Sequence, residues 1–388
     1  MKKKISILGS TGSIGETSLK IILKEKKLFK INTLVANSNL KKILKQIRTF
    51  KPKYYVVADK KVFRRLNIKY KFKHTKIVSD YNKIKEKNDF TIVAIPGLAS
   101  LKPTIQFIKN SKKILLANKE AIICGWNLIK KTAKKYNSVI VPIDSEHFSI
   151  AQLIKDIPND EIDKIYLTAS GGPFLNFSRQ KMNKVKLHHA LRHPKWSMGK
   201  KISIDSATLM NKILELIEAS KLFSFPFNKF KIIIHPQSLV HAIVQFKSGI
   251  TKFLYHHPDM IVPISNAINE KDNNIKKYLK EKIIDSKLQN LSFIEVPEKN
   301  FPIIKLLPKL NKYPSTAIII NAANEILVDQ FLLKKISFNT ISKSIFRVLK
   351  DKNYKKYAIH RAKKLNEILK IDSWARKTTI KILAESKK

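Results

Sequence analysis

Two acidic residues, Asp144 and Glu146, stand two positions apart, directly after the apolar, β-branched segment 138–143. That segment is predicted to be a buried strand. Because successive side chains of an extended chain point to opposite faces, we expect both carboxylates to project to the same side. Neighbouring carboxylates repel each other unless a cation lies between them, and a hard divalent cation with oxygen ligands is the usual partner. The pair therefore predicts a metal site, with two solvated acids in an ordinary loop as the alternative.

A third carboxylate lies on a helix that is predicted to begin near Ser206, with Asp205 or Ser206 as its cap. Positions with i, i+4, i+7 spacing share one face of a helix, and here they are Asn211, Glu215 and Glu218. The opposite face is apolar and comprises Leu209, Met210, Ile213, Leu216 and Ile217. Lys212 flanks the polar face and adds a cation. The alternative is a surface helix with a polar stripe.

A glycine-rich turn, Gly9-Ser-Thr-Gly-Ser-Ile-Gly15, follows a predicted strand at 4–8 and precedes a helical pattern. Strand, glycine turn and helix in this order place a phosphate at a helix N-terminus. The next predicted strand, 31–36, ends at Asn37-Ser38-Asn39 without the acidic residue that usually binds the ribose of NAD, and Lys41 and Lys42 follow. An uncharged pocket beside cations favours NADP. A tight turn and a polar loop without any ligand are the alternatives.

The elements that must hold these residues alternate between strand and helix in the first third of the chain. Predicted strands at 54–58, 90–95, 113–117 and 139–143 are separated by helical stretches such as 41–50 and 102–110. This alternation predicts an α/β fold with a doubly wound, Rossmann-like parallel sheet over residues 1–143. The strand at 113–117 ends at Asn118-Lys119-Glu120, at the carboxyl edge where such sheets bind ligands.

The strand–helix alternation stops near residue 144, which predicts a different architecture for the rest of the chain. Residues 144–265 are expected to form a central α+β domain that carries the metal and the substrate. Residues 266–290 are rich in Lys and Asn and predict a linker. Residues 291–388 predict a C-terminal helical domain, including a helix at 315–333.

Composition narrows the class of protein. The chain has 388 residues and a formal net charge of +48, but only eight of its 77 basic residues are Arg, and the Lys residues are spread along the sequence. Nucleic-acid readers favour Arg and clustered charge, so we expect no nucleic-acid partner, although the field would attract small anions. The single cysteine, Cys124, excludes a disulfide framework and suits the cytoplasm. No apolar run is long enough for a signal peptide or a membrane span.

Nine segments carry a resemblance to one known family. They are Gly9–Gly15, Leu115–Glu120, Pro142–His147, Thr168–Phe174, Arg192–Gly199, Lys201–Thr208, Asn211-Lys212 with Glu215, His235–Ser238 and Asn321–Glu325. In this order and spacing, the chain resembles the 1-deoxy-D-xylulose 5-phosphate reductoisomerase family between residue 3 and about residue 330. The resemblance implies an NADPH-dependent rearrangement and reduction of 1-deoxy-D-xylulose 5-phosphate to 2-C-methyl-D-erythritol 4-phosphate, in the non-mevalonate route to isoprenoids. It also implies a homodimer that uses Mg²⁺, Mn²⁺ or Co²⁺.

The resemblance assigns roles to particular residues. It implies Asp144, Glu146 and Glu215 as metal ligands, and Lys119, Glu146 and His193 as catalytic residues, with Lys119 contacting the substrate hydroxyls. The implied substrate contacts are Lys119, Ser145, Glu146, Ser170, His193, Trp196, Ser206, Asn211, Lys212 and Glu215, with Trp196 in a segment that closes over the substrate. The implied cofactor contacts are Thr11, Gly12, Ser13, Ile14, Asn118, Glu120 and Gly199, and the polar loop after the second strand adds Asn37, Ser38 and Asn39 as expected contacts.

The sequence departs from the family pattern at five positions. Asn37, Ser100 and Ile213 replace glycines, Leu98 replaces alanine, and Pro96 precedes the Gly97–Ser100 turn. Most of these changes lie near the predicted cofactor site, so they bear on NADPH affinity more than on the chemistry.

Two other functions remain open from the sequence alone. A generic NADP-dependent sugar-phosphate or semialdehyde dehydrogenase would share the N-terminal sheet, but it usually supplies a catalytic Cys or a Lys/Tyr pair, and Cys124 has no evident base beside it. A binder of nucleic acid or of an anionic surface is suggested by charge alone.

Overall fold

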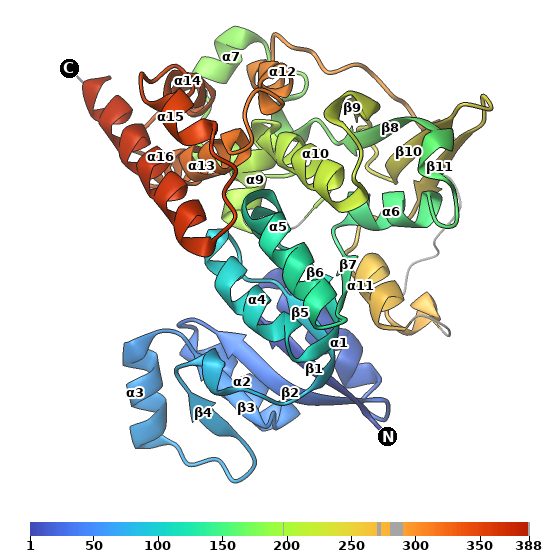
Figure 1. The fold of residues 1–388 in the computed structure, drawn as a ribbon, viewed down its shortest axis with the longest axis vertical. Coiled ribbons are helices and arrows are strands. Elements are labelled where there is room, and N and C mark those ends of the chain that lie inside the picture. The colour runs from blue at the N-terminus through green and yellow to red at the C-terminus, as the bar shows by residue number, and fades with distance from the viewer. Residues whose placement is uncertain (197, 270–272, 280–289, 387–388) are drawn as a thin grey trace. The chain divides into compact units, whose positions relative to one another are not determined.

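The computed structural model describes residues 1–388 apart from 197, 270–272, 280–289 and 387–388. Its internal contacts divide the chain into two compact units (Figure 1). The first unit comprises Met1–Ala121, Asn127–Phe148 and Asp259–Lys282, and the second comprises Ile122–Trp126, Ser149–Pro258 and Ile283–Lys388. This division follows packing and not function, so the functional boundaries predicted at 143, 265 and 290 stay a prediction.

The first unit is built on a seven-stranded parallel sheet in the order β4-β3-β2-β1-β5-β6-β7. Its strands are β1 Lys3–Leu8, β2 Phe29–Ala36, β3 Tyr54–Val57, β4 Lys76–Val78, β5 Asn88–Val93, β6 Ser111–Leu116 and β7 Val139–Pro142. Its helices are α1 Ser13–Lys24, α2 Leu40–Phe50, α3 Lys60–Lys69, α4 Leu101–Ile108, α11 Ile261–Ile268 and parts of α5 Lys119–Lys135 and α6 Ser145–Leu153. The predicted doubly wound sheet is confirmed.

Strand order reverses between β1 and β5, where Ile5 lies opposite Phe90 in register. Ligands bind beyond the carboxyl ends of the strands at such a reversal. The Gly9–Gly15 turn follows β1 and therefore lies at this point.

The chain returns to the first unit through α11. Ile264 and Ile268 are fully buried in the same hydrophobic cluster as Ile5 and Leu34. The sequence predicts residues 266–290 as a linker, but Ala267 and Ile268 are buried, and the Tyr278 hydroxyl donates to Glu25 at 3.1 Å. Within the predicted linker, 270–272 and 280–289 lie outside the described residues.

The second unit holds a four-stranded mixed sheet in the order β11-β10-β8-β9 and most of the remaining helices. Its strands are β8 Ile162–Ala169, β9 Phe230–Ile234, β10 Val240–Phe246 and β11 Thr251–Tyr255. Its helices are α7 Arg179–Asn183, α8 Leu187–Leu191, α9 Lys200–Ala207, α10 Met210–Phe223, α12 Leu307–Leu310, α13 Thr316–Leu332, α14 Phe338–Val348, α15 Tyr354–Ala358 and α16 Leu365–Glu385. The predicted α+β and helical parts of the fold are both present.

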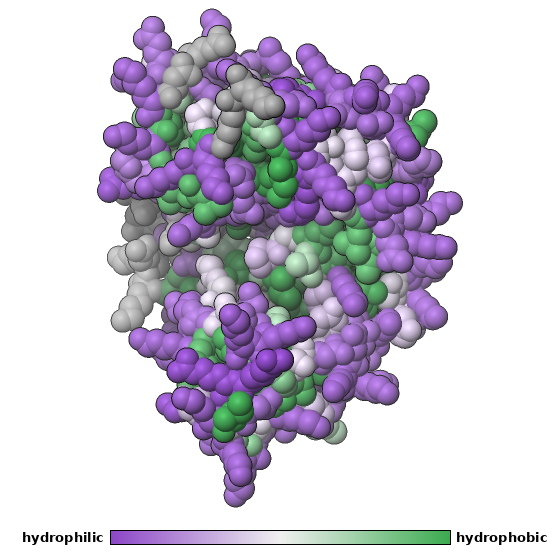
Figure 2. Space-filling model, turned by 90° about the vertical axis from the view of Figure 1, so that its left-hand side faces the viewer, coloured by the Kyte–Doolittle hydropathy of each residue, from purple (hydrophilic) through white to green (hydrophobic). Residues whose placement is uncertain are grey.

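Hydrophilic side chains are spread over most of the face shown in Figure 2, with smaller apolar patches between them. This is the distribution expected from the scattered Lys residues. No helix in the described part of the chain is long and apolar enough to cross a membrane.

Candidate active site

The glycine turn after β1 combines two structural glycines with an accessible one. Gly9 has φ +87°, and a Cβ there would lie 2.6 Å from the carbonyl oxygen of Ala94. A Cβ on Gly15 would collide with the carbonyl oxygen of Gly9. Gly12 is exposed and takes the N-cap position of α1. Thr11, Ser13 and Ile14 also remain at least partly accessible, so the turn presents the backbone of a helix N-terminus, which suits a phosphate.

The three residues after β2 are accessible, and one of them also caps a helix. Asn37, Ser38 and Asn39 are exposed. The side chain of Asn39 caps α2 by accepting a hydrogen bond from the amide of Lys42 at 3.1 Å. Asn39 therefore has a structural role besides its predicted cofactor contact.

The two Lys residues beside this segment differ in their surroundings. The Lys42 ammonium donates to the Thr11 carbonyl at 3.2 Å and pairs with Glu16 at 2.8 Å, so it links α2 to the glycine turn. Lys41 is exposed. Lys41 is consequently the better candidate to contact a 2′-phosphate.

Asn118 joins the loops that follow β5 and β6. Its Oδ1 accepts from the amide of Ala121 at 2.6 Å and from the Ser100 hydroxyl at 2.7 Å. Its Nδ2 donates to the Ile95 carbonyl and to Glu120, each at 2.8 Å. Because the buried Asn118 side chain is saturated by protein partners, we expect it to shape the cofactor site by holding these loops.

The departures from the family pattern fall into two groups in the structure. Leu98, Ser100 and Ile213 are buried, and Ser100 donates to Asn118 as part of the loop network. Asn37 and Pro96 are exposed. Only the second group can meet a ligand directly, so the predicted effect on NADPH affinity rests mainly on Asn37 and Pro96.

Asp144 lies at the centre of a compact polar cluster in the first unit. The Lys119 ammonium lies 3.0 Å from its Oδ2, and Nδ1 of the buried His147 lies 3.8 Å from the same oxygen. One carboxylate oxygen of Glu146 lies within 4.8 Å of one of Asp144. The Ser145 hydroxyl donates to Glu146 at 2.6 Å. The structure thus brings Lys119, Asp144, Ser145 and Glu146 together in one cluster.

The geometry that joins Asp144 and Glu146 differs from the prediction. They do not alternate along a strand, because β7 ends at Pro142 and α6 begins at Ser145. The Asp144 carbonyl accepts the first helical hydrogen bond, from Phe148 at 2.8 Å. Glu146 lies in the first turn, where a carboxylate is favoured by the helix dipole. The two acids are neighbours because they flank a helix start.

The polar face of α10 is confirmed as a shared face, but it is not a solvent face. The Asn211 amide donates to Glu215, and the Lys212 ammonium pairs with the same carboxylate. Glu215 is 1% exposed and Glu218 is fully buried. A helix buried on all sides carries acids only where they are paired or have a function. A surface stripe is therefore excluded for α10.

The donor set suits a hard divalent cation. Asp144, Glu146 and Glu215 offer only carboxylate oxygens, which Mg²⁺ and Mn²⁺ prefer. Each acid already has a donor or cation beside it, Lys119, Ser145 and Lys212 respectively. Such partners orient carboxylates for a metal.

Four predicted phosphate contacts lie together in the second unit. Ser170 Oγ is 2.9 Å from His193 Nε2. Gly172 has φ +62°, and a Cβ there would lie 3.0 Å from the carbonyl oxygen of Ser206, so the serine turn packs against the end of α9. Lys212 is close enough to His193 to lower the pKa of that imidazole. Two hydroxyls, an imidazole and an ammonium suit a phosphate.

The predicted role of Ser206 as a helix cap is wrong. Ser206 lies in the last turn of α9, and α10 begins at Met210 after Leu209, which adopts the left-handed conformation with φ 64°. The alternating pattern of Lys201–Asp205 resembles a strand, yet Lys201 pairs with Asp205 across one helical turn at 2.7 Å. This i, i+4 pair is typical of a helix and is out of reach in an extended strand. Ser206 therefore offers its hydroxyl and not a capped helix N-terminus.

The hydrogen bonds of His193 determine its tautomer. Its Nδ1 accepts from the amides of Trp196 at 2.9 Å and Lys195 at 3.2 Å. Amide N–H groups only donate, so Nδ1 carries no proton and Nε2–H donates to Ser170. The Ser170 oxygen also accepts from the Gly172 amide at 3.1 Å, which leaves the Ser170 hydroxyl proton for a ligand.

Burial, and secondly the Lys212 cation, lower the pKa of His193 from 6.5 to about 4. The folded protein therefore binds fewer protons than the unfolded chain between these two values, and the stability associated with neutral His193 is lost as the pH falls through this window. We expect His193→Gln to flatten the fall in unfolding free energy between about pH 7 and about pH 4. Urea unfolding of the wild-type protein and of His193→Gln, between about pH 7 and about pH 4, measures the unfolding free energy of each. Parallel pH profiles would contradict the prediction.

The Trp196 ring packs against two histidines that the sequence pattern did not single out. It meets His241 edge-on, with ring centroids 6.0 Å apart. His241 stacks on His256 with centroids 3.7 Å apart, and both are buried. Ser197 lies outside the described residues, and Gly199 is exposed at the N-cap of α9. The sequence signal that could have identified His241 is a histidine within an otherwise apolar strand. Such a histidine is more often a packing residue than part of a site.

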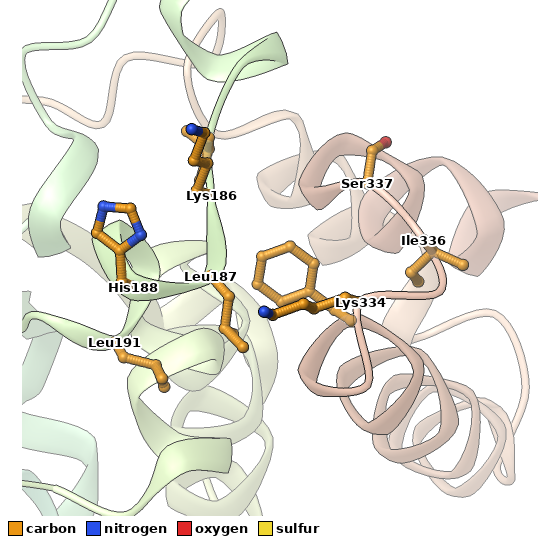
Figure 3. A pocket seen from close by; sticks show the side chains of 9 residues that line it. Lys186, Leu187, His188, Leu191, Lys334, Ile336 and Ser337 are labelled. Atoms are coloured by element: carbon orange, nitrogen blue, oxygen red, sulfur yellow. The ribbon is translucent and has the colours of Figure 1, made fainter.

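A groove of about 470 Å³ in the second unit contains none of the predicted site residues (Figure 3). Its lining includes Leu187, His188, Leu191, Phe331, Lys334 and Ser337. The site is therefore not defined by this groove.

Three sequence families match the chain. Residues 5–125 match the family described as 1-deoxy-D-xylulose 5-phosphate reductoisomerase. Residues 140–223 match the 1-deoxy-D-xylulose 5-phosphate reductoisomerase C-terminal domain, and residues 256–378 match the DXP reductoisomerase C-terminal domain.

Individual relatives agree with these families. The chain is 44% identical to the 1-deoxy-D-xylulose 5-phosphate reductoisomerase of Pelagibacter ubique over 96% of this chain and 97% of the relative. A crystal structure of DOX-P reductoisomerase in complex with NADPH, fosmidomycin and magnesium has a TM-score of 0.92 and 33% identity, covering 100% of this chain and 99% of its own. The enzyme from Zymomonas mobilis in complex with NADPH has a TM-score of 0.87 and 32% identity, covering 99% of both chains.

Proposed function

Because this chain belongs to the 1-deoxy-D-xylulose 5-phosphate reductoisomerase family, we propose how its own residues carry out the family's reaction. It is an oxidoreductase that converts 1-deoxy-D-xylulose 5-phosphate to 2-C-methyl-D-erythritol 4-phosphate with NADPH and a divalent metal. The observation that carries the assignment is the near full-length similarity. A generic dehydrogenase is not favoured, because Cys124 is buried within α5 beside the Asn321 amide.

Asp144, Glu146 and Glu215 are the proposed metal ligands. When bound, the metal supplies Lewis acidity toward substrate oxygens. Glu146 accepts a proton from a substrate hydroxyl, while the Ser145 hydroxyl, which donates to Glu146 at 2.6 Å, orients that carboxylate. Lys119 donates to the substrate oxygens on which negative charge develops, and its pairing with Asp144 at 3.0 Å fixes the ammonium for this task.

Ser170, His193, Ser206, Asn211 and Lys212 are proposed to bind the substrate phosphate. Both lone pairs of the Ser170 hydroxyl oxygen are occupied by donors, so the hydroxyl proton is available for a phosphate oxygen. Lys212 provides the cation. Trp196 closes over the substrate and excludes water, with His241 as its support.

Thr11, Gly12, Ser13 and Ile14 are proposed to bind the NADPH pyrophosphate, and Asn37, Ser38 and Asn39 its ribose phosphate. NADPH supplies the hydride. Asn118, Glu120 and Gly199 complete the proposed contacts. By family resemblance we also propose that the protein is a homodimer. We propose the cytoplasm as its location, because a chain with a single cysteine suits a reducing compartment.

Asn37→Gly is expected to tighten NADPH binding about three- to tenfold. The exposed Asn37 side chain crowds the position at which a glycine lets the cofactor approach in the family. Titration of NADPH fluorescence measures the dissociation constant. Asn137→Gly, at an exposed position of the first unit that is not among the proposed cofactor contacts, is the control and should change affinity little. Weaker binding by Asn37→Gly would contradict the idea that Asn37 limits affinity.

The function is tested by following NADPH absorbance. Oxidation should require both 1-deoxy-D-xylulose 5-phosphate and a divalent metal, and it should stop after EDTA treatment and resume when Mg²⁺ or Mn²⁺ is returned. Oxidation that persists in EDTA would contradict the metal assignment. A folded protein without any oxidation would favour a degenerate enzyme or a binder of anions.

A further inference from the structure

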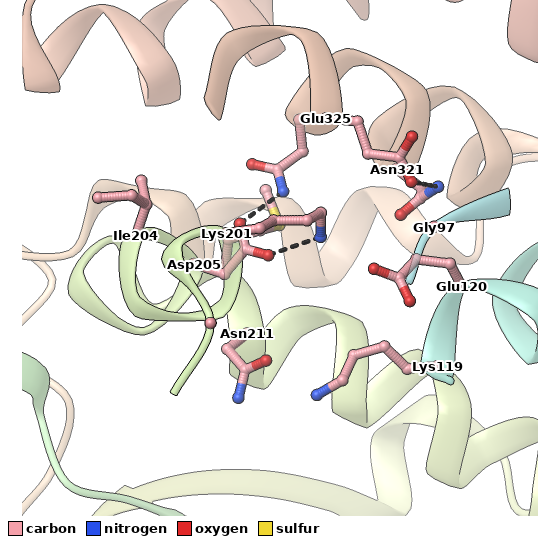
Figure 4. Close-up of polar contacts among 12 residues, drawn as sticks. Gly97, Lys119, Glu120, Lys201, Ile204, Asp205, Asn211, Asn321 and Glu325 are labelled. Carbon is pink, nitrogen blue, oxygen red and sulfur yellow. Dashed lines mark hydrogen bonds and ion pairs between the residues drawn. The ribbon is translucent and has the colours of Figure 1, made fainter. Parts of the chain in front are cut away.

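The Asn321–Glu325 segment of α13 has no part in the proposed reaction, although it is one of the segments that resemble the family. Asn324 is fully buried, and its Nδ2 donates to Asp205 Oδ1 at 2.7 Å. Asp205 is 1% exposed, and its Oδ2 accepts from the Lys201 ammonium at 2.7 Å (Figure 4). One carboxylate on α9 is thus held from two directions, by its own helix and by α13.

A buried carboxylate is stable only when its oxygens are satisfied, so Asp205 has little freedom to move away from Asn324. The donor is itself firmly placed. The next residue, Glu325, pairs with Arg376 of α16, and Arg376 also pairs with Asp372 at 2.7 Å. Helix α13 is therefore tied to α16 on one side and to α9 on the other.

The position of α9 matters because Ser206 follows Asp205 directly. The carbonyl oxygen of Ser206 packs closely against Gly172, and Gly172 lies two residues after Ser170 in the chain. A shift in the last turn of α9 would therefore change the spacing between Ser206 and the Ser170–His193 pair. Differences of about 1 Å in such spacing are enough to weaken binding strongly.

We propose that Asn324 is a positioning residue for the substrate phosphate, because its hydrogen bond to Asp205 fixes the end of α9 and so places Ser206 beside Ser170. The proposal rests on the proposed function through the role of Ser206. Asn324 touches no substrate and acts through Asp205.

Asn324→Leu, which keeps the shape of the side chain and removes the donor, tests the proposal. We expect KM for 1-deoxy-D-xylulose 5-phosphate to rise about tenfold or more, with kcat and the NADPH dissociation constant changed less than about threefold, because binding alone is affected. The affinity for inorganic phosphate, followed by ³¹P NMR, should fall by a similar factor. The double variant Asp205→Asn with Asn324→Asp exchanges the two side chains, so that residue 205 donates the hydrogen bond and residue 324 accepts it. Its KM should return most of the way to the wild-type value.

Asn321→Leu is the matched control, since it removes a buried amide one turn earlier on α13 that bonds to Glu325 and not to α9. It should leave KM unchanged even if the melting temperature falls. A KM within twofold of wild type in Asn324→Leu, an equal rise in Asn321→Leu, or no recovery in the exchange variant would overturn the proposal. If Asn324→Leu does not fold, the exchange variant and phosphate binding decide. A wild-type protein without turnover would instead refute the proposed function.

Discussion

Glu215→Gln is expected to lower kcat by about 10³-fold or more, which corresponds to about 4 kcal/mol of transition-state stabilisation. The variant keeps the size of the side chain but replaces an anionic oxygen ligand by a neutral amide. It also leaves Lys212 without its charge partner on α10. NADPH binding should change less than about twofold, because the proposed cofactor residues lie on other elements.

Steady-state turnover at saturating Mg²⁺ and NADPH fluorescence titration measure these two effects. Glu215→Asp is the control, since it retains the charge and should regain part of the activity at raised metal concentration. Loss of NADPH binding in Glu215→Gln, or a kcat near the wild-type value, would contradict the division of roles between Glu215 and the cofactor residues.

Lys119→Met is expected to lower kcat by about 10²- to 10³-fold, the usual effect of removing a donor from a developing oxyanion. Lys119 is 7% exposed and its ammonium lies 3.0 Å from Asp144, so it acts in a partly dry site where a charge has a large effect. Lys119→Arg should retain more activity, because it preserves the charge.

Lys130→Met controls for the general positive field, because Lys130 is an exposed residue of the same helix α5. It should leave kcat within about twofold, since exposed charges are screened by solvent and salt. Equal losses in Lys119→Met and Lys130→Met would mean that net charge, and not a positioned ammonium, supports turnover.

The parallel sheet could be predicted from sequence because local signals specify it. Strands such as Tyr54–Val57 and Val139–Pro142 are short apolar runs, and the glycine turn identifies β1 as the strand before a helix. The return of α11 to the first unit could not be predicted. Its residues Ile261–Ile268 are apolar, but an apolar helix does not state which core it will join.

The site was predicted better in composition than in geometry. The Asp144 and Glu146 carboxylates are neighbours because a helix begins at Ser145, between them. The β-branched run before them predicts a strand, so the helix start could not be predicted from the sequence. The short segment Lys200–Ala207 alternates like a strand, and tertiary contacts from Asn324 to Asp205 help to hold it as a helix. The burial of Glu215 follows from packing on all sides of α10, which periodicity alone does not reveal.

The most direct test of the reaction is the carbon skeleton of the product. ¹³C-labelled 1-deoxy-D-xylulose 5-phosphate is incubated with the protein, NADPH and Mg²⁺, and the product is examined by ¹³C NMR. A rearrangement followed by reduction predicts the branched 2-C-methyl-D-erythritol 4-phosphate, with the methyl group on a carbon that bears no hydrogen. A linear deoxy-sugar alcohol phosphate, formed by simple reduction of the ketone, would contradict the assignment and identify a generic sugar-phosphate dehydrogenase.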